Sequence, residues 1–304
     1  MNIENIGLTL GQLPVNGGAA QRKPRLALMG EFSAGKSTLA NLLIGAKHLP
    51  VQVTATQLPP VWISQGTAPP YRVDLEGKSI PVSLARLEDV PIFETAYIRM
   101  FEQSDILEQC DIIDMPGISD PNMPAAVWQR ILPQADGVIW CSHATQAWRQ
   151  SESAIWAAMS PELQRRSLLL LTRVDKIVSE RDRDRIVKRV SHETAGLFSG
   201  PCLPISLTKA IAGKNDPAAF DSAGATAFYR ALTVLIQNIR TVDGDVIAPS
   251  GSAKEALAER ETTPVLPRRI RSDGLTGGHT PRPAAGSVGP DFTAFRAQLS
   301  RTAP

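Results

Sequence analysis

One nine-residue stretch constrains the fold more than any other part of the chain. Residues 30–38 read GEFSAGKST, follow an apolar run at 26–29 and open an amphipathic stretch at 37–44. This is the pattern G-x-x-x-x-G-K-[ST] in the strand–loop–helix context in which it binds phosphate. Glycine lets the backbone curl so that its N–H groups point at phosphate oxygens, and the start of the helix adds its positive dipole end. The stretch therefore predicts a P-loop.

The residue types in this loop predict separate contacts with a bound nucleotide. Lys36 is expected to reach the β- and γ-phosphates, and the Ser37 hydroxyl to bind Mg²⁺. The alternative is a glycine-rich turn without a ligand, but the strand and helix patterns on either side favour a nucleotide site. The residues predicted to contact the nucleotide here are Gly30, Ser33, Ala34, Gly35, Lys36, Ser37 and Thr38.

Short apolar runs alternate with amphipathic stretches from residue 25 to about residue 240. Near-continuous apolar runs are typical of parallel strands that are covered on both faces. The pattern therefore predicts an α/β P-loop NTPase fold, a mainly parallel sheet with helices on both faces. Strands are expected at 26–29, 111–114, 137–141, 168–172 and 203–206, helices at 37–44, 125–132, 150–159, 180–197 and 225–239, a hairpin at 71–82, and another helix or strand around 96–108.

A second apolar run ends in the pattern D-x-x-G, at Asp114 and Gly117. Asp114 is expected to hold the metal through a water molecule, and the Gly117 N–H to meet the γ-phosphate, which would tie the following loop to the nucleotide state. A threonine is also needed to bind Mg²⁺ in the triphosphate state. Thr56 lies 19 residues after Ser37 and is the first choice, with Thr54 as the alternative. The predicted metal ligands are Ser37, Thr56 and Asp114, and the predicted catalytic residues are Lys36, Ser37, Thr56, Asp114 and Gly117.

A third apolar run ends in Thr172-Arg173-Val174-Asp175. A carboxylate at a strand end can accept hydrogen bonds from the N1–H and the exocyclic amine of guanine, whereas adenine offers no such pair of donors. Arg173 stands where the usual guanine box has lysine, and its stem can still lie over the base. Ser206, 31 residues after Asp175, can support the base from the other side. These four residues, Thr172, Arg173, Asp175 and Ser206, are predicted to bind guanine; a strand-end aspartate that caps the next helix is the alternative for Asp175.

The composition excludes several other classes of protein. Of 304 residues 43% are hydrophobic and 20% charged, and the net charge of +2 favours neither nucleic acid nor a membrane surface as partner. No apolar run approaches the roughly 18 residues of a spanning helix, and residues 1–5 do not begin a secretory signal. Cys110, Cys141 and Cys202 are too few and too far apart for a disulfide framework or a CxxC metal site. A cytoplasmic protein is expected.

Together these stretches resemble the dynamin-like large GTPases, particularly the bacterial ones. The resemblance rests on GEFSAGKSTLANLLIG at 30–45, LPVQVTAT at 49–56, IIDMPG at 112–117 and LTRVD at 171–175. Asp114 lies 78 residues after Lys36, about twice the gap of the small Ras-like pattern, as in an enlarged dynamin-type G domain. The resemblance implies a GTPase that forms a homodimer through its nucleotide faces, hydrolyses GTP faster when assembled, and works on membranes through a helical stalk.

The residue that positions the catalytic water is not evident. Eukaryotic dynamins use a P-loop glutamine where this chain has Phe32, and Ile118 follows Gly117. The resemblance implies that the Ser33 carbonyl brings a monovalent cation to the phosphates. The candidates for the missing water-positioning role are Gln57, His143, Gln146 and Arg149, although each is favoured as an ordinary loop residue.

Three segments are expected: a leader at 1–24, the G domain at 25–245 and a Pro/Gly-rich tail at 246–304. The leader is expected to pack on the 225–239 helix, and the tail to be disordered because it cannot bury enough apolar surface. The tail is too short for a stalk and lacks heptads, so a partner would supply the stalk or the G domain stands alone.

The first functional interpretation is a dynamin-like GTPase that uses Mg²⁺, is stimulated by G-domain dimerisation, and contacts the inner face of a membrane peripherally or through a stalk-bearing partner. The second is a GTP-dependent switch that hydrolyses slowly or not at all and recruits a protein partner. A GTPase of RNA maturation is disfavoured because the chain offers no basic accessory domain, so no nucleic acid is expected to bind.

Overall fold

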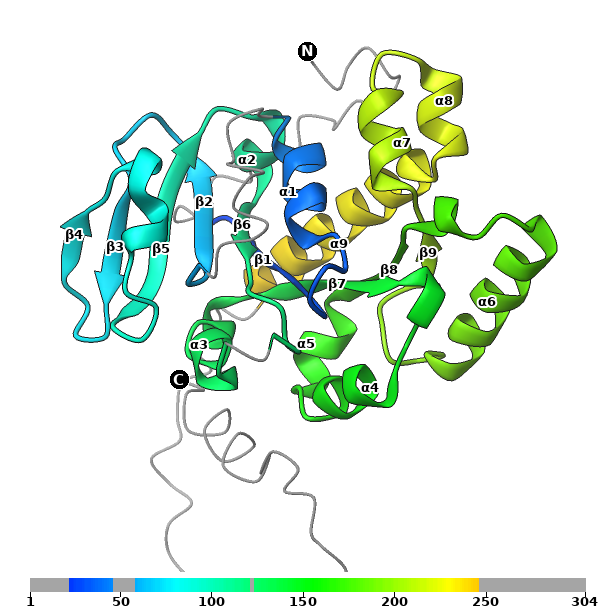
Figure 1. Cartoon of the computed structure of the whole chain (residues 1–304), viewed down its shortest axis with the longest axis horizontal. Coiled ribbons are helices and arrows are strands. Elements are labelled where there is room, and N and C mark those ends of the chain that lie inside the picture. Colours follow the sequence, from blue (N-terminus) through cyan, green and yellow to red (C-terminus); the bar gives the residue numbers. More distant parts are fainter. Residues whose placement is uncertain (1–21, 46–57, 121–122, 246–304) are drawn as a thin grey trace, which may run out of the picture.

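Strand β1, which leads into the P-loop, lies inside a single nine-stranded sheet (Figure 1). The computed structural model describes residues 22–45, 58–120 and 123–245, and the strands named here are those of that part of the chain. Their order across the sheet is β4-β3-β5-β2-β6-β1-β7-β8-β9. The bounds are β1 (Arg25–Gly30), β2 (Val61–Gln65), β3 (Tyr71–Asp74), β4 (Ser79–Pro81), β5 (Thr95–Glu102), β6 (Asp111–Asp114), β7 (Gly137–His143), β8 (Ser167–Thr172) and β9 (Leu203–Pro204).

The sheet has two parts that differ in strand direction. Strands β6, β1, β7, β8 and β9 are parallel to one another. Strand β2 runs antiparallel to β6, β5 is parallel to β2, and the β3–β4 hairpin adds antiparallel pairs at the edge. The predicted mainly parallel α/β sheet and the hairpin at 71–82 are therefore confirmed. The apolar pattern does not single out β2, because its sequence VWISQ is short and ends in polar residues.

The helices cover both faces of the sheet, as predicted. One face is covered by α1 (Lys36–Ile44), α2 (Asp105–Gln109), α7 (Leu207–Ala212), α8 (Pro217–Ser222) and α9 (Ala225–Asp245). The other is covered by α3 (Ala125–Gln129), α4 (Gln150–Ala157), α5 (Pro161–Arg165) and α6 (Glu180–Glu193). Figure 1 shows α1 and α7 on one side of the parallel strands and α4 and α5 on the other. The described residues also form four short 3-10 turns: η3 (Leu84–Asp89), η4 (Leu132–Gln134), η5 (Ala144–Gln146) and η6 (Val174–Lys176).

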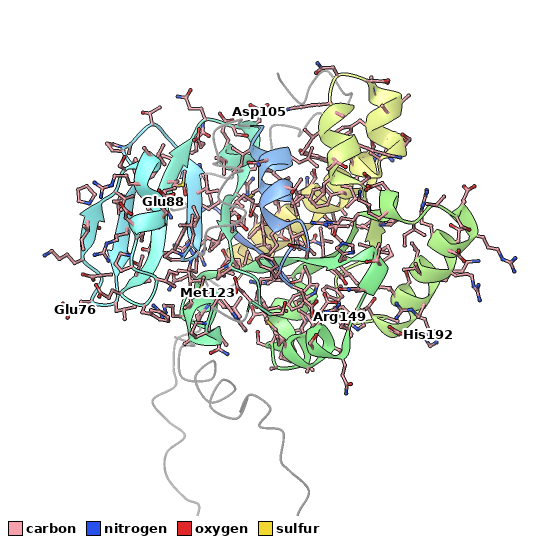
Figure 2. The ribbon with its side chains drawn as sticks, viewed as in Figure 1. Glu76, Glu88, Asp105, Met123, Arg149 and His192 are labelled. Carbon is pink, nitrogen blue, oxygen red and sulfur yellow. The ribbon has the colours of Figure 1, made fainter. Side chains whose placement is uncertain are left out.

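Alternation along β1 divides the apolar interior into two cores. Leu26 and Leu28 join the core under α1 and α9, while Ala27 and Met29 join the core under α4 and α6. Figure 2 shows side chains filling the space between the sheet and its helices. The second core is rich in aromatic rings, among them Trp140, Trp148, Trp156 and Phe198. Because both faces are covered, all six residues of β8 are buried, which explains the continuous apolar run in its sequence.

Several predicted bounds are wrong for local reasons. The helix expected at 125–132 ends at Gln129, because Pro133 has no N–H to donate to the Gln129 carbonyl oxygen and lies in the separate turn η4. The helix expected at 180–197 ends at Glu193, where Thr194 is the C-cap and Gly196 adopts a φ of +76°. The helix expected at 150–159 ends at Ala157 and the one expected at 225–239 continues to Asp245. The strand expected at 203–206 ends at Pro204.

Other predictions about secondary structure stand or lie outside the described residues. The 96–108 segment holds both β5 and α2. The stripe expected on α9 is buried, from Phe228 through Leu232 to Ile239. Residues 1–21 of the leader, the tail, Thr54, Thr56 and Gln57 fall outside the described ranges. None of the helices within 22–45, 58–120 and 123–245 has the length and apolar character needed to cross a bilayer.

Candidate nucleotide-binding site

The loop between β1 and α1 has the backbone geometry of a phosphate cradle. Gly30, Ser33 and Gly35 have positive φ angles of 140°, 58° and 93°. A Cβ atom on Gly30 would lie 2.1 Å from the carbonyl oxygen of Cys141, so only glycine fits between β1 and β7 there. Gly35 is the N-cap of α1, and the first N–H groups of that helix therefore face the loop.

Lys36 lies folded back over this loop. Its side chain is only 7% exposed, and its Nζ donates to the carbonyl oxygens of Gly30 at 3.1 Å and Glu31 at 2.8 Å. Burial lowers the pKa of Lys36, while the nearby Asp114 carboxylate acts in the opposite direction. A phosphate oxygen offers this buried ammonium a full negative charge in place of two neutral carbonyl groups.

Asp114, at the end of β6, faces Lys36 and Ser37. Burial raises the pKa of its carboxyl, and the charge of Lys36 and a hydrogen bond with the Ser37 side chain oppose that shift. Its Oδ1 atom is buried and has no hydrogen-bond partner among the described residues. A hydroxyl and a carboxylate are the hard oxygen ligands that Mg²⁺ prefers, and a hydrated metal ion would satisfy this unpaired oxygen. The residues present therefore fit a Mg²⁺ ion.

The segment after β6 lies directly against the P-loop. A Cβ atom on Gly117 would come within 2.8 Å of the Cα of Phe32, so this position has no room for a side chain. The Ile118 N–H donates to the carbonyl oxygen of Gly30 at 3.2 Å, and the Phe32 N–H donates to the Ser119 hydroxyl at 3.2 Å. The P-loop and residues 117–119 are therefore in direct contact.

The predicted guanine-binding residues meet at the ends of β8 and β9. The Ser206 hydroxyl donates to Oδ1 of Asp175 at 2.6 Å, across the 31 residues that separate them. Ser206 does not extend β9 as predicted; it is the N-cap of α7, because its hydroxyl accepts the Lys209 N–H. Thr172 turns away from this group: its buried hydroxyl donates to the carbonyl oxygens of Ala34, at 2.7 Å, and Ser142. Thr172 therefore links β8 to the P-loop.

A cavity of about 360 Å³ joins these elements. It is lined by the P-loop, by the segment from Asp114 to Gly117 and by Arg173, whose φ of +56° bends the chain beyond β8. Of the predicted site residues that the structure describes, the cavity walls include Ser33, Gly35, Lys36, Ser37, Thr38, Asp114, Gly117 and Arg173. Five other predicted site residues do not line the cavity: Gly30, Ala34, Thr172, Asp175 and Ser206.

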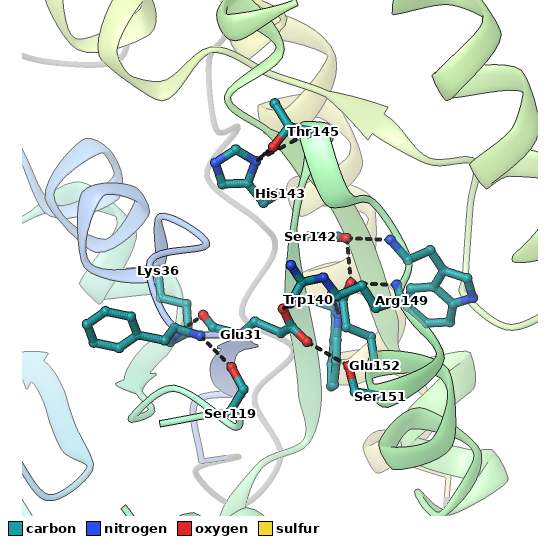
Figure 3. A network of polar contacts seen from close by, with 12 residues as sticks. Glu31, Lys36, Ser119, Trp140, Ser142, His143, Thr145, Arg149, Ser151 and Glu152 are labelled. Carbon is teal, nitrogen blue, oxygen red and sulfur yellow. Dashed lines mark hydrogen bonds and ion pairs between the residues drawn. The ribbon is translucent and has the colours of Figure 1, made fainter. Parts of the chain in front are cut away.

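A charged network beside the P-loop escaped the sequence analysis (Figure 3). Nη1 of Arg149 lies 3.0 Å from Oε2 of Glu31, and the Ser151 hydroxyl donates to Oε1 of Glu31 at 2.7 Å. The sequence pattern indicates Arg149 only as a candidate for the residue that positions the catalytic water. Nothing in the sequence pairs it with a residue 118 positions away.

Two other candidates for the water-positioning role lie on the same loop. His143 is held by its neighbour, since its Nδ1 accepts the Thr145 N–H at 3.2 Å. Burial and the charge of Arg173 lower the pKa of His143. Gln146 is exposed in η5. The part of the loop that packs inward is Trp148, whose ring contacts Trp140 and Phe198.

Comparison with known proteins identifies relatives of this arrangement. Residues 26–174 match the model of the dynamin family. Dynamin-like protein 2 of Campylobacter jejuni is 26% identical over 161 residues, which cover 51% of this chain and 26% of that protein. The match thus spans about a quarter of the length of this curated relative.

Solved structures show the same fold. Two chains, each from an oligomerised bacterial dynamin pair described as providing a mechanism for long-range sensing and tethering of membranes, align with TM-scores of 0.54 and 0.53. Their sequence identities are 19% and 20%, and each alignment covers 73% of this chain and 37% or 36% of the dynamin chain. At this level of identity the likeness concerns the fold alone.

Proposed function

Because residues 26–174 form a G domain of the dynamin family, we propose that the chain binds GTP at the P-loop cavity and hydrolyses it to GDP and phosphate. The observation that carries the proposal is the group of Lys36, Ser37 and Asp114. The Lys36 ammonium donates to two backbone carbonyl oxygens, and the buried Asp114 oxygen has no hydrogen-bond partner among the described residues. A phosphate chain and its metal ion would pair with both groups.

Each residue has a role in this proposal. Lys36 neutralises charge on the β- and γ-phosphates, and Ser37 and Asp114, with Thr56 as a further ligand, hold Mg²⁺. When bound, this ion neutralises the charge that develops on the phosphate oxygens. Gly117 offers its N–H to the γ-phosphate, and Asp175, oriented by Ser206, accepts hydrogen bonds from guanine.

The proposal extends to assembly. We infer that two chains pair through their nucleotide faces, with hydrolysis stimulated by that pairing, and that the Ser33 carbonyl helps to hold a monovalent cation there. The dynamin chains with the same fold are described as an oligomerised pair, which supports assembly but does not specify the face that pairs. Their described membrane tethering supports a peripheral membrane contact, made directly or through a stalk-bearing partner.

The test is phosphate release from GTP by the full chain over a hundredfold range of protein concentration, with ATP as control and Lys36→Ala in parallel. The expected result is a specific rate that rises with protein concentration for GTP only and that disappears in the variant. A rate that is the same for ATP and GTP would contradict the guanine assignment, and a rate retained by Lys36→Ala would contradict the site.

A second candidate function is a GTP-dependent switch with negligible hydrolysis. It is favoured by one observation: the described residues that line the cavity include no glutamine, and Phe32, where eukaryotic dynamins have one, is 56% exposed. Tight GTP binding with a flat, near-zero rate at every protein concentration would select this function.

A further inference from the structure

The P-loop carries a negative charge of its own, on the loop that is proposed to receive a triphosphate. The Glu31 side chain is 12% exposed, and each of its two carboxylate oxygens has a donor from the start of α4. The donor to Oε2 is the guanidinium of Arg149 and the donor to Oε1 is the hydroxyl of Ser151. Figure 3 shows these side chains reaching toward one another between the P-loop and α4.

The charge of Glu31 acts on the group proposed to bind phosphate. Its carbonyl oxygen accepts the closer of the two hydrogen bonds from Lys36 Nζ, at 2.8 Å. Its carboxylate is also near enough to raise the pKa of Lys36 against the effect of burial. An uncompensated carboxylate here would therefore repel a phosphate group bound at Lys36.

The local structure places Arg149 where it can compensate that charge. The preceding residue, Trp148, has a φ of +54°, a conformation that is rare for a bulky side chain. It is held there because its N–H donates to the buried Ser142 hydroxyl at 2.9 Å and its ring packs on Trp140 and Phe198. Strained backbone of this kind persists where the surroundings over-determine it, and it is concentrated at functional sites.

A buried glutamate completes the support. Glu152 is 1% exposed and accepts the Trp140 indole N–H at 2.9 Å, the Ser142 hydroxyl at 3.0 Å and the Arg149 backbone N–H at 3.0 Å. These bonds fix the backbone of residue 149 at the N-cap of α4. The N-cap position favours Ser, Thr, Asp or Asn, and arginine has no acceptor with which to cap the helix. The Arg149 side chain is thus directed to Glu31 and not to its own helix.

We propose that Arg149 is a positioning residue that neutralises Glu31, so that the P-loop accepts the negative charge of a nucleotide triphosphate. The inference rests on the proposed binding of GTP at this loop. It requires that the loss of Arg149 weakens GTP more than GDP, because the triphosphate carries more negative charge. It also requires that removal of the Glu31 charge restores the affinity for GTP in the variant without Arg149.

The experiment is a double-mutant cycle on the full chain, with the dissociation constants of GTP and GDP measured by calorimetry. Arg149→Ala is expected to weaken GTP about tenfold and GDP less, and added salt is expected to shrink the difference. Arg149→Ala combined with Glu31→Gln is expected to return to within about threefold of the parent protein, and Arg149→Lys, which keeps the charge, to bind like the parent. The matched control is Arg86→Ala, which removes an arginine from an exposed pair with Asp89 far along the chain from the P-loop.

The possible outcomes separate the inference from the proposed function. If the parent protein does not bind GTP, the proposed function fails. If it binds and Arg149→Ala binds equally well, only the inference fails. If the double variant stays as weak as Arg149→Ala, Arg149 acts by touching the nucleotide or shaping the loop, and charge compensation is overturned. The intrinsic tryptophan fluorescence of Trp148 and its neighbours reports in each case whether the loop has kept its packing.

Discussion

The two ends of the proposed nucleotide site, a phosphate end and a base end, differ in how their polar groups are paired. At the phosphate end, Lys36 is a buried charge, and the partly buried Asp114 has a buried oxygen without a hydrogen-bond partner among the described residues. At the base end, Asp175 is half-buried and already paired with Ser206 at 2.6 Å. At the phosphate end, polar groups remain that a ligand would pair, whereas the base end has its carboxylate paired before any ligand binds. The phosphate end should therefore set how tightly a nucleotide binds, and the base end which nucleotide binds.

The largest effect is expected from a substitution at the phosphate end. Lys36→Ala removes the only lysine of the P-loop, and we expect the affinities for GTP and ITP to fall by the same factor, at least about a hundredfold, or about 3 kcal/mol. The factor is shared because both nucleotides carry the same phosphates. Calorimetric titration measures it, with thermal melting as the control for folding. A loss that differs several-fold between the two bases would show that the two ends do not act separately.

A comparable change at the base end should alter selectivity. Asp175→Asn replaces two acceptors by one acceptor and one donor, which suits xanthine, whose C2 carries an oxygen, better than guanine, whose C2 carries an amine. We expect GTP to weaken on the order of a hundredfold and XTP to bind better than it does to the parent protein. Competition between the two nucleotides on the variant measures this reversal. If GTP and XTP both weaken equally, Asp175 is a structural residue and the base lies elsewhere.

The link between the two ends can be tested through Thr172. Its hydroxyl donates to the backbone carbonyl oxygens of Ala34, in the P-loop, and of Ser142, and so joins β8 to the P-loop. Thr172→Val removes this hydrogen-bond donor from both carbonyl oxygens. We expect a loss of about 1–3 kcal/mol in the free energy of unfolding. Denaturant unfolding measures it, and the matched control is Thr241→Val, at an exposed position near the end of α9. An unchanged stability would mean that the loop and β8 are held together by packing alone.

The sequence predicted the phosphate end well because its signal is local. Strand, loop and helix follow one another within residues 25–44, and the D-x-x-G run fixes Asp114 at a strand end. The sequence also predicted that Asp175 and Ser206 lie on either side of the base, but it did not predict the hydrogen bond between them. The details that failed depend on tertiary contacts: Ser206 caps a short helix, and the Thr172 hydroxyl binds backbone. Neither outcome leaves a periodic trace in the sequence.

The pair of Glu31 and Arg149 shows the same limit more sharply. A glutamate in the P-loop and an arginine before a helix are ordinary when read separately. Their contact follows from the parallel pairing of β1 with β7, which brings the loops after both strands to one edge of the sheet. It also depends on the positive φ of Trp148, which no propensity of tryptophan predicts.

The smallest expected effect lies between the two ends, at His143. Burial, then the charges of Arg173 and Arg149, lower its pKa below the ordinary value of 6.5, and Asp175 opposes them. The fold therefore favours the neutral ring, whose Nδ1 accepts the Thr145 N–H. Above pH 6.5 the ring is neutral in both states, and as the pH falls below 6.5 the unfolded chain takes up a proton first, so stability declines until the folded ring also titrates. Since solvent screens this partly exposed ring, we expect less than about 1 kcal/mol.

His143→Asn isolates that contribution. Asparagine keeps an acceptor for the Thr145 N–H but does not titrate, so the difference in unfolding free energy between the variant and the parent should grow as the pH is lowered from 7 to 5. Urea unfolding at several pH values measures this difference, and the carboxyl groups that titrate in both proteins cancel in it. A difference that does not change with pH would show that His143 supports the loop after β7 only through its hydrogen bond with Thr145. The protonation of His143 would then have no effect on stability.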